Sequence, residues 1–481
     1  MDGRDARAAR TTRSLCCGVA AATLLTASLY IARTPPADGT PASAAPRPEA
    51  PLDPPAAFRP DAERSAPRID APAATRRIAG TVLDAARRTP LRGASVWVGS
   101  AEVVTEADGR FTVDVPVDST LAIVKAPGYE MRRVPIDSRL AVALRPKSVR
   151  AAYLTYYGIA EPSIRNRVLD LVDRTELNAV VIDVKGDRGL IPYRTEVPEA
   201  LAAGALGPVI IKDFDGMLRS FRERGIYTIA RVVTFKDHVL AHHRPDLAIV
   251  DTRTGGPWMD NEKLAWVDPF REEVWDYLIA IAREAAAKGF DEVQFDYVRF
   301  PTDGHLSAAA YSQVNSAATR LPAIAGFLAK ARRALGPTGV FLAADVFGYT
   351  AFNANDTDIG QRVEELAPHL DYICPMVYPS GYHLGIPGFR NPVKHPYEVV
   401  RESVRLIRQR SQHTAVQVRP WLQDFRDYAF DRRVFGSREV RAQIKGAVDG
   451  GGIGFMLWNP RNDYTAQALL PRPPPAKKRP G

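Results

Sequence analysis

The chain has 481 residues, a hydrophobic content of 46% and a formal net charge of +9. This length exceeds one ordinary domain, so we expect two or three folded units. Residues 1–33 carry five Arg and two Asp, and residues 472–481 add two Arg and two Lys, so the two ends hold +7 of the charge. Because the rest is nearly neutral, composition excludes a broad phosphate-binding surface and predicts no nucleic-acid partner.

Residues 1–33 have the pattern of an export signal. Four Arg residues precede an uncharged, mostly apolar stretch at 15–32, as in a signal peptide. Its length lies at the lower edge of what spans a bilayer, so a cleaved signal peptide and a retained signal anchor both stay open. In either case the positive charge before the stretch directs the rest of the chain out of the cytoplasm. We expect a periplasmic, cell-surface or secreted protein, with anchoring in the inner membrane as the alternative to release.

Composition then changes along the chain. Residues 34–75 are rich in Pro and Ala, which predicts an extended linker, and residues 466–481 form a basic, Pro-rich tail. Residues 76–146 hold short β-branched runs between turn signals such as Asp108-Gly109, which predict a small all-β sandwich. Only Cys374 lies in the predicted folded part, so no disulfide framework is expected.

The predicted sandwich resembles a known accessory module. The strings GTVLD (80–84), PLRGASV (90–96), TEADGRF (105–111) and APGY (126–129) are similar to the carboxypeptidase regulatory-like domain. The resemblance implies a non-catalytic domain.

Residues 149–465 alternate strand-like apolar runs with amphipathic helical stretches. Strands that are apolar on both faces indicate a parallel sheet covered by helices, and eight such units close into a (β/α)₈ TIM barrel. The fold class is therefore α/β, a TIM barrel preceded by the sandwich. An open doubly wound sheet is the alternative, although no Gly-rich phosphate loop follows the first strand. The predicted strands are 150–157, 179–185, 227–234, 291–299, 340–347, 372–378, 416–423 and 452–458.

Polar residues end most of these strands. A TIM barrel builds its active site at the carboxyl ends of its strands, and alternation along a strand keeps residues two apart on one face. A charge facing the helix layer would be desolvated without a partner, so we place these side chains at the barrel mouth. They are Asp183 and Lys185 on the second strand, Arg231 on the third, Asp296 and Arg299 on the fourth, Asp345 on the fifth, Tyr378 on the sixth, Trp421 and Asp424 on the seventh, and Trp458 and Asn459 on the eighth.

Two of these carboxyl groups suit glycosidic bond hydrolysis, which needs one protonated and one ionised carboxyl beside the scissile bond. Asp296 and Asp345 end adjacent predicted strands. We expect Arg299 to help keep Asp296 ionised, as nucleophile or base, and the apolar surroundings of Asp345 to favour its protonated form as the acid. The alternative is that each Asp is half of a buried ion pair. Retention or inversion stays open, because it depends on the distance between the two carboxyls.

The remaining mouth residues would position a sugar. The rings of Tyr378, Trp421 and Trp458 offer apolar faces for stacking. The other predicted substrate-binding residues are Asp183, Lys185, Arg231, Arg299, Asp424 and Asn459.

Four short sequence segments in the predicted barrel resemble those of a known family. NAVVIDVK (178–185), GFDEVQFDYVRFP (289–301), DYICPMVYP (371–379) and LWNP (457–460) resemble a bacterial family named as putative glycosyl hydrolases, formerly a domain of unknown function. The resemblance covers about residues 150–465. It implies an α-amylase-like barrel with a catalytic Asp after strand four, the position of Asp296. Barrels of that type carry a Glu after strand five, where this chain has Asp345.

No metal or cofactor is predicted. His238, His242 and His243 have a spacing that could ligate a metal on a helix, but no carboxylate accompanies them in a fixed motif. The predicted function is therefore O-glycosyl hydrolysis of a cell-envelope or extracellular polysaccharide. One alternative is a non-catalytic carbohydrate-binding or envelope-scaffold protein. A metal-dependent deacetylase would need ligating His at strand ends, and all eight His lie elsewhere.

Overall fold

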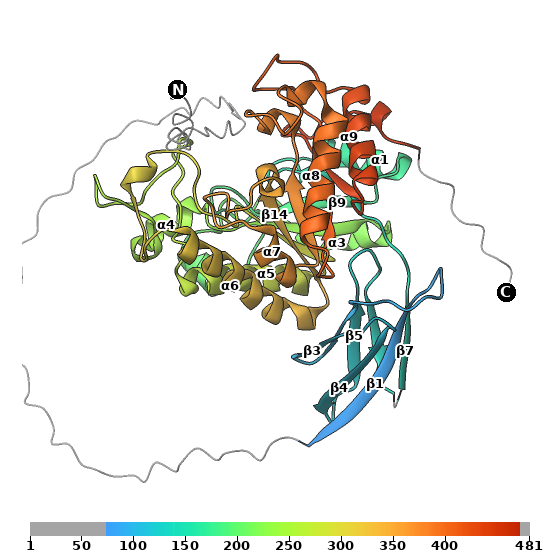
Figure 1. Ribbon diagram of the computed structural model, residues 1–481. Coiled ribbons are helices and arrows are strands. Elements are labelled where there is room, and N and C mark those ends of the chain that lie inside the picture. The colour runs from blue at the N-terminus through green and yellow to red at the C-terminus, as the bar shows by residue number, and fades with distance from the viewer. Residues whose placement is uncertain (1–73, 138, 472–481) are drawn as a thin grey trace, which may run out of the picture.

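The computed structural model describes residues 74–137 and 139–471 (Figure 1). Within these ranges no helix is both long enough and apolar enough to cross a bilayer. The predicted export segment, the linker up to residue 73 and the tail from residue 472 lie outside the described residues.

The N-terminal part consists of two small β-sheets. In one sheet β1 (Thr75–Asp84) pairs antiparallel with β4 (Arg110–Pro116) and parallel with β7 (Arg139–Leu144). The other has the order β3-β2-β5-β6, and one apolar core holds residues of both sheets, including Val82 and Val96. The predicted all-β sandwich is therefore present. The strands of the second sheet are β2 (Ser95–Val98), β3 (Ala101–Val104), β5 (Leu121–Lys125) and β6 (Arg132–Pro135).

The remainder is a closed barrel of parallel strands. The order is β14-β12-β10-β9-β8-β18-β17-β15, and pairing of β14 with β15 closes the ring. The predicted (β/α)₈ fold is confirmed, and the alternative of an open sheet is wrong because no free edge remains. The strands are β8 (Arg150–Leu154), β9 (Ala179–Lys185), β10 (Tyr227–Val233), β12 (Glu292–Asp296), β14 (Phe341–Phe347), β15 (Tyr372–Met376), β16 (Gln417–Val418) with β17 (Trp421–Gln423), and β18 (Phe455–Trp458).

The seventh strand is divided into β16 and β17. Arg419 and Pro420 lie between these two segments, and proline has no N–H to donate to the neighbouring strand. Both segments pair with β15, so they form one position in the barrel.

Helices surround the barrel (Figure 1). Residues facing outward from the strands, such as Val180 and Phe295, join the apolar core shared with the helices, whereas Val181 and Tyr372 point inward. The helices are α1 (Pro162–Arg174), α2 (Pro198–Ala202), α3 (Phe214–Glu223), α4 (His238–His243), α5 (Glu272–Lys288), α6 (Ala317–Leu335), α7 (Val363–Leu366), α8 (Pro396–Arg410) and α9 (Ser437–Asp449).

Two long loops at the mouth pair with each other. β11 (Val250–Asp251), from the loop after β10, forms a short antiparallel ladder with β13 (Ala309–Ala310), from the loop after β12. These loops therefore lie together over the side of the mouth where Asp296 ends its strand.

The sandwich is docked at the opposite end of the barrel, where the strands begin. Lys125 Nζ donates to the Val340 carbonyl at 2.6 Å and to Asp371 Oδ2 at 2.7 Å, just before β14 and β15. The backbone N–H of Gly128 donates to the Tyr372 hydroxyl at 2.8 Å, and Met131 packs against the inward-facing residues. The loop between β5 and β6 therefore closes the floor of the barrel.

We predict that Lys125→Met lowers the free energy of unfolding by about 3 kcal/mol, because Asp371 would lose its closest partner while buried. The two side chains are only 3% and 4% exposed. The measurement is the urea midpoint followed by circular dichroism. Lys445→Met is the matched control, because the exposed Lys445–Asp449 pair should contribute less than about 1 kcal/mol. Equal midpoints for the two variants would contradict a stabilising role of the buried pair.

Candidate active site at the barrel mouth

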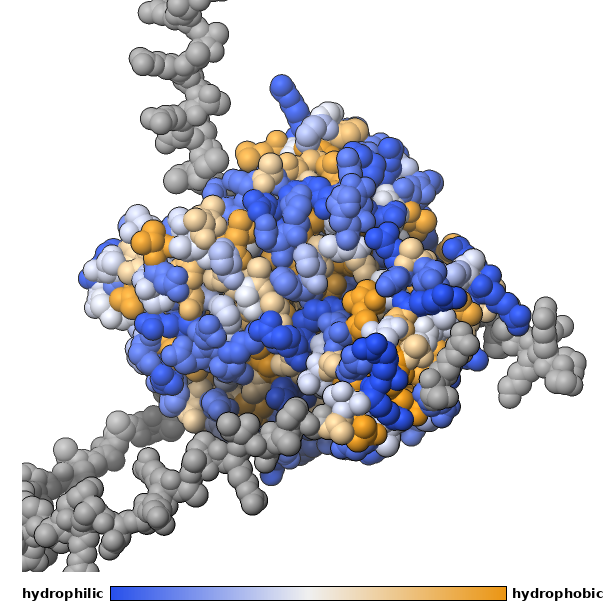
Figure 2. All heavy atoms as spheres, turned by 60° about the horizontal axis from the view of Figure 1, so that its bottom comes forward, coloured by the Kyte–Doolittle hydropathy of each residue, from blue (hydrophilic) through white to orange (hydrophobic). Residues whose placement is uncertain are grey.

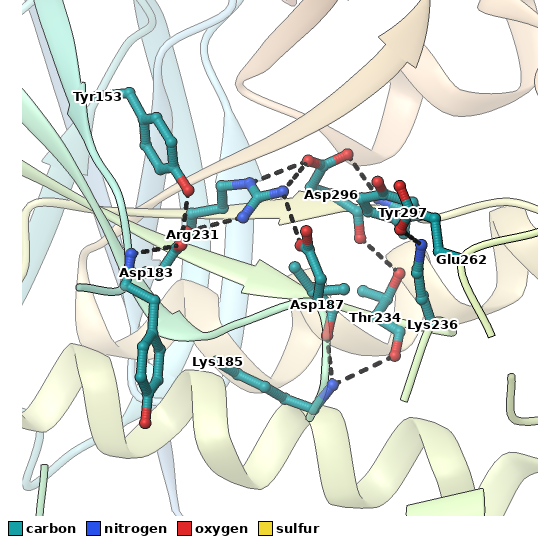
Figure 3. A network of polar contacts seen from close by, with 12 residues as sticks. Tyr153, Asp183, Lys185, Asp187, Arg231, Thr234, Lys236, Glu262, Asp296 and Tyr297 are labelled. Carbon is teal, nitrogen blue, oxygen red and sulfur yellow. Dashed lines mark hydrogen bonds and ion pairs between the residues drawn. The ribbon is translucent and has the colours of Figure 1, made fainter. Parts of the chain in front are cut away.

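Inward-facing polar side chains gather at the carboxyl ends of the strands (Figure 3). Asp183 and Arg231 are paired in the ladder between β9 and β10, and Arg231 lies beside Gln294 in the ladder between β10 and β12. The register therefore places Asp183 opposite Arg231, and Asp296 lies two residues beyond Gln294 on the same face of its strand.

Arg231 is the centre of this group. Nη1 donates to Asp183 Oδ1 at 2.7 Å, and Nε and Nη2 donate to Asp296 Oδ2 at 2.9 and 2.6 Å. Nη2 also reaches Asp187 Oδ1 at 3.3 Å. The guanidinium stacks over the rings of Tyr153 and Trp458 and is only 2% exposed. Arg231 was predicted to bind substrate directly, but here its donors are used to hold three aspartates.

Asp296 is held in a fixed orientation. Oδ2 receives the two bonds from Arg231, while Oδ1 accepts the backbone N–H of Tyr297 at 2.6 Å. Tyr297 has φ of 52°, an unusual conformation for a non-glycine residue that is found most often at functional sites. The Asp296 side chain keeps 8% of its surface exposed, so it lies deep in the mouth but is not sealed off.

Asp345 lies next to Asp296 on the neighbouring strand. The ladder between β12 and β14 ends with Phe295 opposite Ala344, so the following residues, Asp296 and Asp345, are side by side and both face inward. Burial raises the pKa of the Asp345 carboxyl well above its usual range, and the charge of Asp296 raises it further. Trp421 Nε1 donates to Asp345 Oδ1 at 2.8 Å and opposes that rise. Asp345 therefore tends to retain its proton beside a carboxyl that is bound by Arg231.

Two predicted cations are engaged elsewhere. Lys185 is fully buried, pairs with Asp237 at 2.8 Å and donates to the Val233 carbonyl at 2.6 Å. Arg299 stacks on Phe347, Trp266 and Tyr297 and donates to its neighbour's carbonyl. Arg299 interacts with the charge of Asp296, but the direct contact with Asp296 comes from Arg231, on the adjacent strand.

The predicted aromatic platforms differ in exposure. Trp421 is 1% exposed and lies edge-on to Tyr153 and Trp458, below the solvent-facing surface. Trp458 is half-buried and stacks on Tyr153 with ring centroids 4.1 Å apart, and Tyr378 is half-buried against Phe425. Trp458 and Tyr378 thus retain surface at the mouth.

Asp424 and Asn459 fix the chain that follows β18. Asp424 accepts the backbone N–H of Thr465 at 2.9 Å and its hydroxyl at 2.6 Å, and burial raises the pKa of Asp424 to about 6. Asn459 Nδ2 donates to the carbonyls of Asp424 and Asp463. In this structure both side chains make hydrogen bonds within the protein.

Three residues of the group were not predicted from sequence. Tyr153 donates its hydroxyl to Asp183 Oδ2 at 2.7 Å, Asp187 contacts Arg231, and Tyr297 supplies the N–H to Asp296. Two-residue alternation could have indicated Asp187, which follows Lys185 by two positions. No sequence pattern signals the backbone conformation of Tyr297.

The predicted histidine cluster lies on α4. The rings of His238 and His242 are 4.2 Å apart, and His242 Nδ1 contacts the His238 carbonyl. Over residues 74–137 and 139–471 there is no group of three His, Cys, Asp or Glu side chains that could hold a metal ion.

The fold and this mouth define a TIM-barrel protein with a carboxylate cluster where barrels of this class carry their active sites. Residues 151–464 match the family described as "Putative glycosyl hydrolase domain", and the chain belongs to that family. No curated protein matches the chain.

Solved structures give matches with TM-scores below 0.5. A hypothetical protein from Ruminiclostridium thermocellum is 39% identical, with 40% of this chain and 97% of that chain covered and a TM-score of 0.36. The PgaB (BpsB) glycoside hydrolase domain from Bordetella bronchiseptica is 14% identical, with coverage of 66% and 94% and a TM-score of 0.44. The spore cortex-lytic enzyme of Bacillus megaterium is 12% identical, with coverage of 74% and 86% and a TM-score of 0.40.

The buried Asp345 carboxyl should make stability depend on pH. Its pKa is raised in the folded protein, so above the unfolded value of about 3.9 the folded state binds more protons than the unfolded state. The stability contributed by Asp345 is therefore lost as pH rises towards the folded pKa, by up to about 1.4 kcal/mol per pH unit. We expect Asp345→Asn to remove this decline.

Urea unfolding of both proteins from pH 4 to pH 8 measures the effect. The difference in unfolding free energy, Asn variant minus wild type, should grow with pH. A difference that is constant over this range would contradict protonation of Asp345 in the folded state.

Proposed function

We propose that the chain is an O-glycosyl hydrolase that cleaves a cell-envelope or extracellular polysaccharide outside the cytoplasm. The observation that carries the proposal is the pair of adjacent carboxyls, Asp296 bound by Arg231 and Asp345 with a raised pKa. A glycosidase needs one carboxyl in each protonation state. The export pattern of residues 1–33 supports the location, and membrane anchoring through that segment remains part of the proposal.

In the proposed reaction Asp345 gives its proton to the glycosidic oxygen as the bond to the anomeric carbon breaks. Asp296 attacks that carbon and forms a glycosyl ester. Water then attacks the same carbon, Asp345 takes the proton from the water, and Asp296 leaves as a carboxylate. Neighbouring strands lie about 4.8 Å apart, so the side-by-side register favours the separation of about 5–5.5 Å typical of retaining enzymes.

Other mouth residues have supporting roles in this proposal. Arg231 supplies the positive charge that Asp296 needs before attack and orients its carboxylate. Tyr378 and Trp458 would contact the sugar, because both rings keep exposed surface. Asp183, Lys185, Arg299, Trp421, Asp424 and Asn459 would act by holding these groups in place rather than by direct contact with sugar.

One observation favours a second candidate function. Asp345 is 2% exposed and Asp296 is 6% exposed, and such burial also suits a carbohydrate-binding or envelope-scaffold protein that does not turn its ligand over. The two functions differ in whether new reducing ends appear.

A panel of envelope and extracellular polysaccharides, assayed for new reducing ends, tests the proposal. Wild type should release them from at least one polymer, Asp296→Asn should release none, and Asp345→Asn should be slower by about 10²–10⁴-fold, the usual contribution of a general acid. Asp170→Asn, on the exposed face of α1, is the control and should match wild type. Binding without turnover by wild type would instead support the scaffold function.

The anomeric configuration of the first product, followed by NMR, tests the reaction course. Retention is expected from the side-by-side register of Asp296 and Asp345. An inverted first product would show that a carboxyl other than this adjacent pair activates the water.

A further inference from the structure

Asp187 differs from the other carboxylates bound to Arg231 because it faces solvent. Its side chain is 45% exposed, whereas those of Asp183 and Asp296 are 4% and 8% exposed. Oδ1 lies 3.3 Å from Arg231 Nη2, the same nitrogen that bonds Asp296, and Figure 3 shows Asp187 extending towards that shared guanidinium. A group that enters the mouth and approaches Asp296 therefore meets Asp187.

The turn that carries Asp187 is held rigidly. The N–H of Gly186 donates to the Leu190 carbonyl at 3.0 Å, and the N–H of Gly189 donates to the Gly186 carbonyl at 2.9 Å. Gly189 has φ of 89°, and a Cβ there would lie 2.0 Å from Asp237 Oδ1, so the turn rests on the buried partner of Lys185. Asp187 is thus placed before any ligand arrives, which lowers the entropy lost on binding.

Two tyrosine rings follow one another from this turn, and the second is exposed. The Tyr156 ring is packed against Gly186, 3.3 Å from the position of an added Cβ, and Tyr157 meets Tyr156 edge-on with centroids 5.0 Å apart. Tyr157 is 70% exposed. The lower side of the molecule in Figure 1, which Figure 2 brings forward, shows hydrophobic residues only in small groups among hydrophilic ones. Tyr157 lies in the loop after β8 and Asp187 in the turn after the neighbouring β9, so the two adjoining segments offer both elements of sugar recognition, an apolar face and a hydrogen-bond acceptor.

The charges around Asp187 limit which sugar can bind. Asp183, Asp187 and Asp296 share the guanidinium of Arg231. The nearby ammonium groups are already paired, Lys185 with Asp237 and Lys236 with Asp260 and Glu262. Arg299, the other guanidinium near Asp296, is buried against aromatic rings, so a carboxylate or sulfate on the incoming ring would mainly meet the carboxylates and be repelled, whereas hydroxyl and amino groups can donate to Asp187.

We propose that Asp187 is a specificity-determining residue of this mouth, which accepts hydrogen bonds from an uncharged or amino-bearing sugar stacked on Tyr157 and rejects uronic acids. The inference rests on the proposed glycosidase function and adds the substrate class. Asp187 acts by binding and not by proton transfer, so its loss should raise KM and leave kcat and its pH profile in place.

Binding is measured first, independently of turnover, in the full-length chain carrying Asp296→Asn. Isothermal titration with hexamers of N-acetylglucosamine, glucosamine and galacturonate should show binding of at least one of the first two and none of the third. Adding Asp187→Asn should weaken that binding about ten- to hundredfold, the effect of losing a hydrogen bond to a charged group. Adding Tyr157→Ala should also weaken it, and adding Asp170→Asn should not.

Binding of the galacturonate hexamer at least as tight as that of the other two, an unchanged affinity after Asp187→Asn, or no binding of any hexamer would overturn the proposal. With a polymer that wild type cleaves, Asp187→Asn should raise KM about tenfold or more with kcat within about threefold. A collapse of kcat at unchanged KM would make Asp187 catalytic and would also overturn it. Absence of turnover by wild type, with Asp187-dependent binding intact, contradicts the proposed hydrolase function alone.

Discussion

One buried guanidinium organises the mouth of this barrel. Asp183, Asp187 and Asp296 come from two strands and a turn, and each would repel the others if Arg231 were absent. Burying a charge is unfavourable unless it is paired and hydrogen-bonded. Arg231 meets this requirement with three donor nitrogens and with the faces of Tyr153 and Trp458. Asp345 is not bound by this cation, and burial raises its pKa well above the usual range.

This arrangement gives two carboxyls of the same chemical type different surroundings. Asp296 and Asp345 stand on adjacent strands at the same level, yet one contacts a cation and the other contacts the neutral indole of Trp421. Their environments therefore differ, and unequal environments are the general means by which enzymes assign acid and base roles to like residues. The assignment of acid and base roles depends on which strand carries Arg231. It therefore follows from the arrangement of the barrel strands and not from the type of either residue.

The barrel and the inward position of its polar residues were predictable, because strand-length apolar runs and two-residue alternation are local features. Asp296 could be assigned to the mouth in this way. The partner of Asp296 could not, because Arg299 is three residues away in sequence while Arg231 is 65 positions away, on the adjacent strand and opposite Gln294. Likewise, alternation predicts that Trp421 faces inward, but not that Trp458 and Tyr153 would cover it. Depth within a barrel depends on the packing of neighbours that the local pattern does not record.

The sandwich lies at one end of the barrel, and the carboxylate mouth lies at the other. Lys125 and the loop after β5 occupy the floor of the barrel, and Figure 1 shows β1 beginning at the far end of the sandwich. Whatever precedes Thr75 thus joins the protein on the side opposite the carboxylate mouth. If that upstream chain attaches to a surface, the attachment leaves the molecule at the end opposite the mouth and therefore does not cover the opening that long polymers would have to reach.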